Sequence, residues 1–373
     1  MTTAVKTAAA PLCVVAAYLL FWPVPISPVA WRAPVWAGYG GAYAGNTRLA
    51  AARAVSIAPE VGPEHIAFGP DGKLYTGVLS GKVLRMDADG RGIETYVDTG
   101  GRPLGLDFDA AGTLIVADAF RGLLAVGADR KVTVLVDHVG ATPVLFADAV
   151  IVAADGRMLF TDASQRMSAR KYGTFDASLL DILEHSCSGR VLEYDPATQQ
   201  THVVIGGLCF PNGVALSADQ AQMFIAETGV YRIWRVARAA RDLDARTIAP
   251  RGNAQARVIL DNLPGFPDNL TRGANGRLWT GFTKPRSRLI DQVADKPALR
   301  AVMLRLPKFL WPVPPAYGHV IAFDEDGHVV ADLQDASGAL PETSGATEHD
   351  GRLYVQSLHA PAFGIVERAA AGL

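Results

Sequence analysis

The chain is poor in the residues and motifs that mark several large protein classes. Only three of its 373 residues are cysteines, and no C-x-x-C or cysteine–histidine pattern is present, which argues against a thiolate-based zinc site. Lysines and arginines number 35 and aspartates and glutamates 37, without a basic run, so nucleic-acid binding is not indicated. The G-x-S-x-G elbow of serine hydrolases and phosphate-binding glycine loops are missing as well. Any chemistry must come from other side chains.

Charge is also missing from one long stretch near the N-terminus. No charged residue occurs from Ala8 to Trp31, a length that suffices to cross a bilayer. Three prolines in the second half restrict the expected helix to about residues 11–22, which is nearer to the length of a signal-peptide apolar region. The clearest small-x-small cleavage site lies far downstream, and tryptophans that suit a membrane interface occur nearby. We therefore expect a signal anchor over residues 1–31 and an alanine- and glycine-rich linker over 32–54.

What the chain does have is one short phrase repeated six times. The copies read PEHIAFGPDGKLYTG, PLGLDFDAAGTLIVAD, ADAVIVAADGRMLFTD, PNGVALSADQAQMFIAE, PDNLTRGANGRLWTG and TSGATEHDGRLYVQS. Each joins apolar residues, a tight turn and a second β-like run. The copies align on a turn residue, which is Gly72, Gly112, Gly156, Gln220, Gly276 and Gly351 in order.

The repeat predicts an architecture. Spacings of about 40 residues and more indicate a propeller or a solenoid, and further β-like runs fill the second half of each unit. Four strands per unit and six units give an all-β, six-bladed β-propeller over residues 55–373. A β-sandwich joined to an unrelated domain is the alternative, but it leaves the sixfold register unexplained. Because Lys6 weakly marks a short cytoplasmic tail, we expect the propeller to be membrane-anchored on the exported side.

Hard oxygen ligands recur at one place in the repeat. Eight positions before the aligned turn residues stand Glu64, Leu104, Asp148, Asn212, Asp268 and Thr343. Equivalent places face one another around the axis of a propeller, so three carboxylates and one amide should meet there. Carboxylates gathered in this way raise one another's pKa unless a cation intervenes.

The ligand type indicates which cation would fit. An all-oxygen set suits Ca²⁺, then Mg²⁺ or Mn²⁺, and Asn269 could add another amide oxygen. The alternative is that each acidic or amide side chain merely bonds a neighbouring backbone group. Four such residues in one repeat register favour the cation.

The repeat phrases also resemble those of a known family. GPEHIAF, GRPLGLDF, TLIVADA, GRMLFTD, GRVLEYDP, FPNGVALS, LPGFPDN and EHDGRLYV together are similar to the strictosidine synthase-like propellers. The branch they most resemble is membrane-anchored and typified by the adipocyte plasma membrane-associated protein. More distant similarity extends to gluconolactonase and paraoxonase propellers. The resemblance covers nearly everything from about Gly62 onward.

The resemblance implies a ligand set. In metal-dependent relatives, a first-blade glutamate, third- and fourth-blade asparagines and a fifth-blade aspartate hold a catalytic Ca²⁺ or similar ion. Those motif places fall on Glu64, Asp148, Asn212 and Asp268, so the third-blade residue departs from the pattern. Leu104 stands where paraoxonases have a histidine, which removes their histidine-based mechanism.

A further departure concerns the reaction that names the family. Ser344 stands where true strictosidine synthase has its catalytic glutamate, so the alkaloid-forming condensation is not expected.

Two features of the chain leave alternatives open. Cys187 and Cys209 could pair in an exported domain, or could remain unpaired thiols. Insertions occupy residues 164–188 and 284–317, and the second mixes basic residues with leucine, phenylalanine and tryptophan. It could form a lid over the tunnel mouth that touches the membrane, or a helix packed on the propeller with a solvated basic face.

Two functions from different classes follow. The first is a Ca²⁺-dependent hydrolase of lactones or aryl esters, in which Asp268, with Asp148 second, acts as general base and the cation polarises the carbonyl. Its partners would be a small-molecule ester or lactone and, through the N-terminal anchor, the membrane. The second is a membrane-tethered, non-catalytic binding or scaffold propeller with a structural metal, because a fold does not fix a function.

Overall fold

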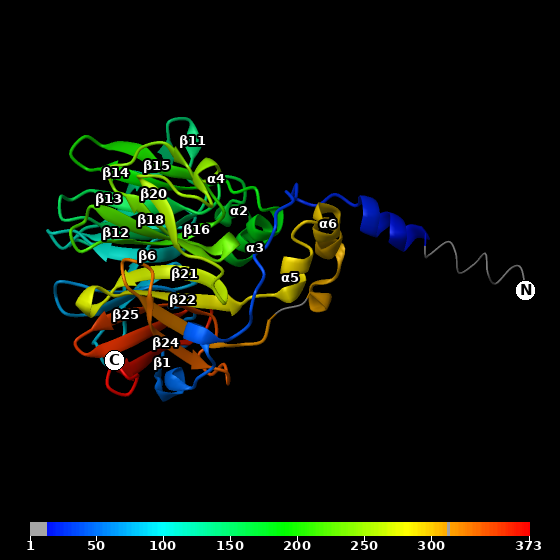
Figure 1. Cartoon of the computed structure of the whole chain (residues 1–373). Coiled ribbons are helices and arrows are strands. Elements are labelled where there is room, and N and C mark those ends of the chain that lie inside the picture. Colours follow the sequence, from blue (N-terminus) through cyan, green and yellow to red (C-terminus); the bar gives the residue numbers. More distant parts are fainter. Residues whose placement is uncertain (1–12, 312–313) are drawn as a thin grey trace, which may run out of the picture.

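Six β-sheets around a common axis make up most of the chain in the computed structural model, which describes residues 13–311 and 314–373 (Figure 1). The inner strands contact one another in a closed cycle, β2 to β6, β12, β16, β21, β25 and back to β2. A closed cycle of six sheets confirms the predicted six-bladed propeller.

The blades follow one another along the sequence. From the axis outward, the first three are β2 (Ile66–Phe68), β3 (Leu74–Gly77), β4 (Lys82–Met86), β5 (Glu94–Asp98); β6 (Pro103–Phe108), β7 (Leu114–Asp118), β8 (Gly122–Val126), β9 (Val132–Val136); and β12 (Ala147–Val152), β13 (Met158–Asp162), β14 (Gly189–Asp195), β15 (Gln200–Leu208), β19 (Leu243–Asp244). The last three are β16 (Pro211–Leu216), β17 (Gln222–Glu227), β18 (Arg232–Ala237), β20 (Ala256–Leu260); β21 (Gly265–Arg272), β22 (Leu278–Pro285), β23 (Gly318–Phe323), β24 (Val329–Asp335); and β25 (Thr343–His349), β26 (Arg352–Ser357), β27 (Ala362–Glu367), β1 (Arg53–Ser56). A two-stranded ribbon, β10 (His138–Val139) with β11 (Thr142–Pro143), stands apart from them.

The sixth blade closes the ring with strands from both ends of the chain. Its outer strand β1 pairs antiparallel with β27, with Arg53 opposite Ile365 and Ser56 opposite Ala362. The N-terminal strand thereby completes a sheet whose other three strands come from the C-terminus, so the ring has no open edge between its first and last blades.

The six aligned turn residues share one backbone conformation. All have positive φ: Gly72 72°, Gly112 81°, Gly156 83°, Gln220 58°, Gly276 75° and Gly351 74°. Glycine adopts this left-handed conformation without steric cost, and five of the six repeats use it. Gln220 keeps the same geometry without glycine, which confirms that the fourth repeat was aligned correctly.

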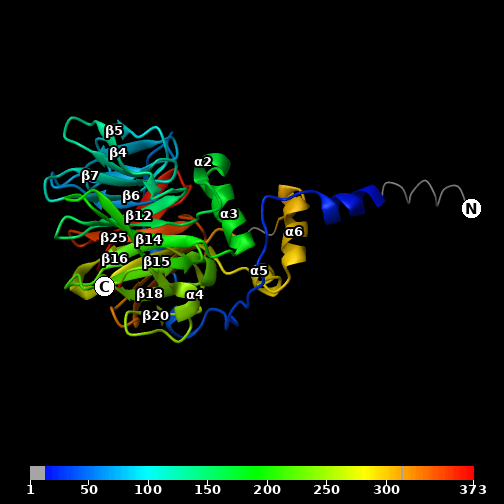
Figure 2. The same ribbon diagram turned by 90° about the horizontal axis from the view of Figure 1, so that it is seen from above.

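Helices gather at one end of the propeller. The first insertion forms α2 (Ala169–Tyr172) and α3 (Thr174–Glu184), and the second forms α5 (Arg288–Gln292), α6 (Pro297–Arg305) and η5 (Lys308–Leu310). We call these five elements the cap (Figures 1 and 2). Shorter turns elsewhere are η1 (Gly41–Tyr43), η2 (Arg48–Ala51), η3 (Thr228–Val230), α4 (Ala245–Ile248) and η4 (Ala274–Gly276).

The N-terminal segment crosses the cap before it reaches the propeller. Residues 13–21 are helical, and the Arg305 side chain of α6 donates to the carbonyls of Leu19 (2.9 Å) and Trp22 (2.6 Å) at the end of that helix. The backbone of Val29 then bonds that of Glu184 in α3 (2.8 Å). Further on, Leu49 is buried in the core of the fifth and sixth blades.

Within the described residues, every helix is too short or too polar to traverse a bilayer. Residues 1–12 of the predicted anchor lie outside the described part of the chain, so the anchor stays a prediction.

Candidate functional site at the propeller axis

A bulge recurs in the inner strands at the positions that carry the proposed ligands. In each of five blades the register of the inner strand shifts over the same three-residue step: Pro103 to Leu106, Ala147 to Val150, Pro211 to Val214, Pro267 to Leu270 and Thr343 to Ala346. A bulge re-aims the side chain of the extra residue. The repeat thereby turns one side chain per blade toward the axis.

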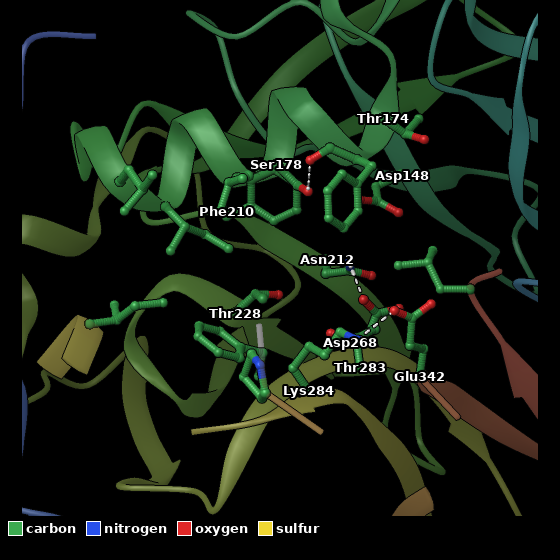
Figure 3. A pocket seen from close by; sticks show the side chains of 18 of the residues that line it. Asp148, Thr174, Ser178, Phe210, Asn212, Thr228, Asp268, Thr283, Lys284 and Glu342 are labelled. Carbon is green, nitrogen blue, oxygen red and sulfur yellow. Dashed lines mark hydrogen bonds and ion pairs between the residues drawn. The ribbon is translucent and has the colours of Figure 1, made fainter. Parts of the chain in front are cut away.

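The four proposed ligands line one cavity. Glu64, Asp148, Asn212 and Asp268 all border a cavity of about 290 Å³, and each is at most 5 % exposed. Figure 3 shows Asp148, Asn212 and Asp268 extending into this cavity from separate blades. Leu104 lines the same cavity, so the ring is only partly polar. The structure thus brings together the residues that the sequence placed at one repeat position.

The shared three-residue step shows that the sixth-blade residue equivalent to Leu104 is Ser344, so the predicted position Thr343 was wrong by one residue. Thr343 serves a backbone role instead. Its hydroxyl donates to the carbonyl of His319 (2.8 Å) and accepts from the amide of the same residue (2.9 Å).

Hydrogen bonds orient three of the four side chains and leave two oxygens free. Asn212 Nδ2 donates to Asp268 Oδ2 (3.0 Å), and the Asn269 amide nitrogen Nδ2 donates to Glu64 Oε1 (2.7 Å). Glu64 Oε2 and Asn212 Oδ1 are buried without any hydrogen-bond partner. Asn269 therefore positions Glu64 through its nitrogen, whereas the sequence suggested it could supply an amide oxygen.

Burial and mutual repulsion destabilise the ionised carboxylates. Burial raises the pKa of Asp268 well above its usual value, and the charges of Glu64 and Asp148 raise it further. Burial, followed by the charge of Glu64, also raises the pKa of Asp148 well above its usual range. A bound cation would relieve this repulsion, because its positive charge would stabilise the ionised forms of all three acids.

A buried arginine beside this cluster was not singled out from the sequence. Arg102 is 1 % exposed, and its guanidinium donates to the carbonyl of Gly62 (3.3 Å). Burial raises the pKa of Glu64, and the positive charge of Arg102 opposes that rise. The available signal was the one basic residue of the phrase GRPLGLDF, two residues before Leu104.

The oxygen donors of these four side chains are of the type that a hard cation prefers. Two buried oxygens lack partners, and none of the three carboxylates forms an ion pair with a described lysine, arginine or histidine. Ca²⁺ binds such oxygens at about 2.3–2.6 Å. The donor atoms of the three carboxylates are not all within 4.8 Å of one another, because among the described residues only one group of three histidine, cysteine or acidic side chains meets that distance.

That one compact group lies elsewhere and consists of His185, Cys187 and Cys209. Cys187 and Cys209 form a disulfide, which confirms the pairing alternative and leaves no thiolate to bind a metal. The disulfide joins the segment that follows α3 to the start of the fourth blade. The His185 ring stacks on Trp31 of the N-terminal segment at 4.2 Å between centroids.

The walls and roof of the cavity are apolar. Phe146, Phe210 and Phe266 border it from the propeller, and α3 lies across it with Phe175 and Ile182 facing the space. From the second insertion, the lining residues are Lys284, Ile290, Met303, Leu304, Lys308, Trp311 and Pro314. The second insertion therefore forms part of a lid over the tunnel mouth, as the first of its two alternatives predicted, while the membrane contact of that alternative stays a prediction.

A charged trio lies beside the cavity, with Glu342 and Lys284 in the lining. Glu342 accepts from Lys284 Nζ (2.6 Å) and lies 2.7 Å from His359 Nδ1. Burial would raise the pKa of Glu342, but the bonds to His359 and Lys284 prevail and lower it to about 2. Glu342 also has a φ of 52°, a left-handed conformation that costs energy for a residue other than glycine. Sequence analysis did not identify this trio, because Lys284 lies at the end of β22 while Glu342 and His359 lie in two loops of the sixth blade.

Ser344 supports the site through the backbone. Its hydroxyl donates to the main-chain carbonyl of Glu64 (2.5 Å), and its side chain is fully buried. The absence of the strictosidine-forming condensation stays a prediction.

Comparison with known proteins identifies the family. The model "Strictosidine synthase-like, N-terminal" matches residues 41–86, and the model "Strictosidine synthase" matches residues 148–239. The adipocyte plasma membrane-associated protein of Salmo salar is 33% identical over 86% of this chain and 79% of its own length. Its Homo sapiens counterpart is 32% identical over 85% and 77%. Protein STRICTOSIDINE SYNTHASE-LIKE 13 of Arabidopsis thaliana is 31% identical over 75% and 73%.

Solved structures share the fold at low identity. A gluconolactonase of Xanthomonas campestris superimposes with a TM-score of 0.57 at 19% identity, over 86% of this chain and 90% of that one. A calcium-binding protein of Agrobacterium tumefaciens, regucalcin, gives a TM-score of 0.54 at 17% identity, over 84% and 93%. These matches support the propeller architecture, and the curated relatives establish the lineage. The chain belongs to the strictosidine synthase-like family.

Proposed function

We propose that this protein is a divalent-cation-dependent hydrolase of lactones or aryl esters. The observation that carries the proposal is the set of three buried carboxylates and one amide, with two unpartnered oxygens, on the floor of an apolar cavity. Solved structures of the same fold described as a gluconolactonase and as a calcium-binding protein support the choice of chemistry and cation.

The four residues on the cavity floor have two proposed roles, which are binding of the cation and reaction with the substrate. Glu64, Asp148, Asn212 and Asp268 would hold Ca²⁺, or another hard divalent cation such as Mg²⁺ or Mn²⁺. The bound cation supplies Lewis-acid polarisation of the substrate carbonyl. Asn269 fixes Glu64 by donating to Oε1 (2.7 Å).

Asp268 is the proposed general base. Asn212 holds its Oδ2, and the backbone amide of Asn269 donates to its Oδ1 (3.1 Å), so the carboxylate has a fixed orientation. In the hydrolytic step Asp268 accepts a proton from water as the water oxygen bonds to the carbonyl carbon. The carbon–oxygen ester bond then breaks, and the proton passes to the leaving alcohol. Asp148 is the second candidate for this base.

The cavity excludes water and selects an apolar substrate. Its aromatic and aliphatic walls favour an aryl or alkyl group over a sugar, and the roof formed by α3 and α6 shields the reacting carbonyl.

The proposed location is a membrane, with the propeller on the exported side. Several of the curated relatives that match are called plasma membrane-associated, and the Cys187–Cys209 disulfide suits an oxidising compartment.

The decisive test is a panel of aryl esters and lactones assayed with EDTA-treated protein, before and after Ca²⁺ is restored. Turnover should require the cation and should vanish in Glu64→Gln and Asp268→Asn. Asp107→Asn is the matched control, because Asp107 is also an acid of an inner strand but bonds the backbone amides of Phe108 and Val152 away from the cavity. Full activity in Glu64→Gln would remove the proposed site.

A non-catalytic binding protein is the second candidate. The three carboxylates are not all within 4.8 Å of one another, which favours this candidate, because a catalytic cation needs several close ligands. If calcium raises the melting temperature but no ester or lactone is turned over, this candidate replaces the hydrolase.

A further inference from the structure

Exposed apolar side chains are concentrated at the cap end of the molecule. Among the described residues, all but four of the large hydrophobic side chains that are strongly exposed lie in the cap or in the N-terminal segment. The most exposed in the cap is Phe309, at 84 %, and its neighbour Leu310 is 55 % exposed. Phe175, Leu289 and Leu299 belong to the same group. Apolar patches of this kind on a soluble surface mark an interaction site.

The same surface carries an excess of positive charge. Residues 284–317 contain seven lysines and arginines and two aspartates, a net charge of +5 in a chain whose net charge is −2. Exposed basic residues adjoin the apolar ones: Arg32, Arg170, Lys171, Arg288, Lys296 and Lys308. Two nearby acids offset part of this charge, since Asp176 pairs with Lys308 (2.9 Å) and Asp295 with Lys296 (3.5 Å). Arg32, Arg170, Lys171 and Arg288 form no ion pair among the described residues.

The N-terminal helix lies at this end as well. In both views, α5 and α6 stand between the propeller and the helix formed by residues 13–21 (Figures 1 and 2). Arg305 of α6 holds the end of that helix by bonds to two of its last carbonyls. The apolar helix and the apolar cap surface are therefore parts of one face.

We propose that this face docks on a bilayer that contains anionic lipids, with Phe309 and Leu310 inserted at the interface and the basic residues on headgroups. Exposed apolar side chains flanked by lysine and arginine are typical of protein surfaces that bind an anionic bilayer. The contact is separate from any anchoring by the N-terminal residues, and it does not rest on the proposed hydrolase activity.

The docking would set the direction in which the cavity opens. Lys308 and Trp311 line the cavity, while Phe309 and Leu310, between them in the chain, are exposed. Residues 308–311 thus belong to both the lid and the docking surface, so a docked cap brings the cavity mouth to the lipid.

The test uses the full chain in vesicles, with a label that reports the cap directly. In a Cys13→Ser background, which removes the exposed free thiol, an environment-sensitive fluorophore is attached to Phe309→Cys or, as control, to Val330→Cys. Val330 is 55 % exposed on β24 of the propeller. Vesicles contain phosphatidylcholine with or without phosphatidylserine, and lipids brominated on the acyl chains serve as quenchers.

The label at 309 should be quenched severalfold more than the label at 330, only with phosphatidylserine, and less at high salt. A label at Leu299→Cys should lose its quenching when Phe309→Asp and Leu310→Asp are added, and keep it when Leu79→Asp is added instead. Equal quenching at 309 and 330 would overturn the proposal. The proposal would also be overturned if the 309 label were shielded in lipid-free protein and this shielding were lost on dilution. A second copy of the chain would then cover the face in place of the bilayer.

Discussion

Asn212 Nδ2 donates to Asp268 Oδ2 on the neighbouring blade over 3.0 Å, and Asn212 Oδ1 is buried without a hydrogen-bond partner. The side-chain amide of Asn212 therefore has two roles at the propeller axis. It fixes the carboxylate of the proposed base, and it presents an oxygen to the cavity. An aspartate at 212 could not donate, and it would place a fourth carboxylate beside three that already resist ionisation.

The first prediction concerns the stability of the cation-bound protein. The unfolded chain cannot bring four blades together, so a cation that binds the cavity floor should stabilise only the folded state. Calcium at a hundredfold excess over its dissociation constant should add about 2.7 kcal/mol to the free energy of unfolding. Denaturant titrations with EDTA and with calcium measure the difference. Zinc should give a much smaller effect, because the floor offers no nitrogen or sulfur donors.

The second prediction concerns the third-blade residue. Asp148→Asn should weaken calcium binding roughly tenfold, because the charge of the ligand set tunes affinity. It should also raise the melting temperature of the EDTA-treated protein, since Asp148 adds to the repulsion that destabilises ionised Asp268. Activity should stay equal or rise, because a less neutralised cation polarises a carbonyl better. Calorimetric binding and thermal melts separate the two effects, and a lower melting temperature without calcium would contradict the electrostatic argument.

The third prediction concerns the close approach of inner strands. A Cβ at Gly213 would overlap the backbone of Asn269 and Leu270 on the neighbouring inner strand. Gly213→Ala should therefore destabilise the fold by about 1–3 kcal/mol. Gly206→Ala is the matched control, because a Cβ there meets no atom within 4 Å. Equal urea midpoints for the two variants would show that the strands have room to separate.

The fourth prediction concerns acid stability. The folded pKa of Glu342, about 2, lies below its ordinary value of 4.5, so the ionised form stabilises the folded state. That stabilisation is complete above about pH 4.5 and is lost as the pH falls toward 2. After a discount for solvent screening at the open rim, it amounts to about 1–2 kcal/mol.

Unfolding of the wild type and of Glu342→Gln, measured across this pH range, tests the assignment. The stability difference between the two proteins should shrink as the solution is acidified. A difference that stays constant from pH 6 to pH 2 would show that the Glu342 carboxylate is not held ionised by Lys284 and His359.

The fifth prediction concerns the disulfide. Its two cysteines are 22 residues apart, so loss of the bond should lower the free energy of unfolding by about 3 kcal/mol. Thiol titration of the unfolded, unreduced chain should find one reactive thiol, that of Cys13, and the reduced chain should show all three. Three thiols before reduction would contradict the pairing.

The sequence predicted those parts of the molecule that the repeat controls. The turn residues, the six blades and the inner positions of Glu64, Asp148, Asn212 and Asp268 recur at fixed spacing, so one alignment placed them all. Gln220 shows the strength of this signal, because it was found without being a glycine.

The parts that the repeat does not control could not be placed in the same way. Arg102 reaches the cluster from a strand start whose partner, Gly62, lies 40 residues away. Glu342 and His359 of the sixth blade meet Lys284 only because the fifth and sixth blades pack side by side. The contact of Arg300 with Val29 joins segments separated by 271 positions, and no local pattern encodes such a pairing.

The central claim is that a hard cation binds at the propeller axis, and an anomalous difference map tests it most directly. Crystals grown with Mn²⁺ in place of Ca²⁺ should show one strong peak on the cavity floor, about 2.0–2.6 Å from Glu64 Oε2 and Asn212 Oδ1, with Asp148 and Asp268 drawn in around it. A floor without a peak, with Glu64 and Asp268 more than about 8 Å apart and so unable to share an ion at such bond lengths, would contradict the site and the hydrolytic function built on it.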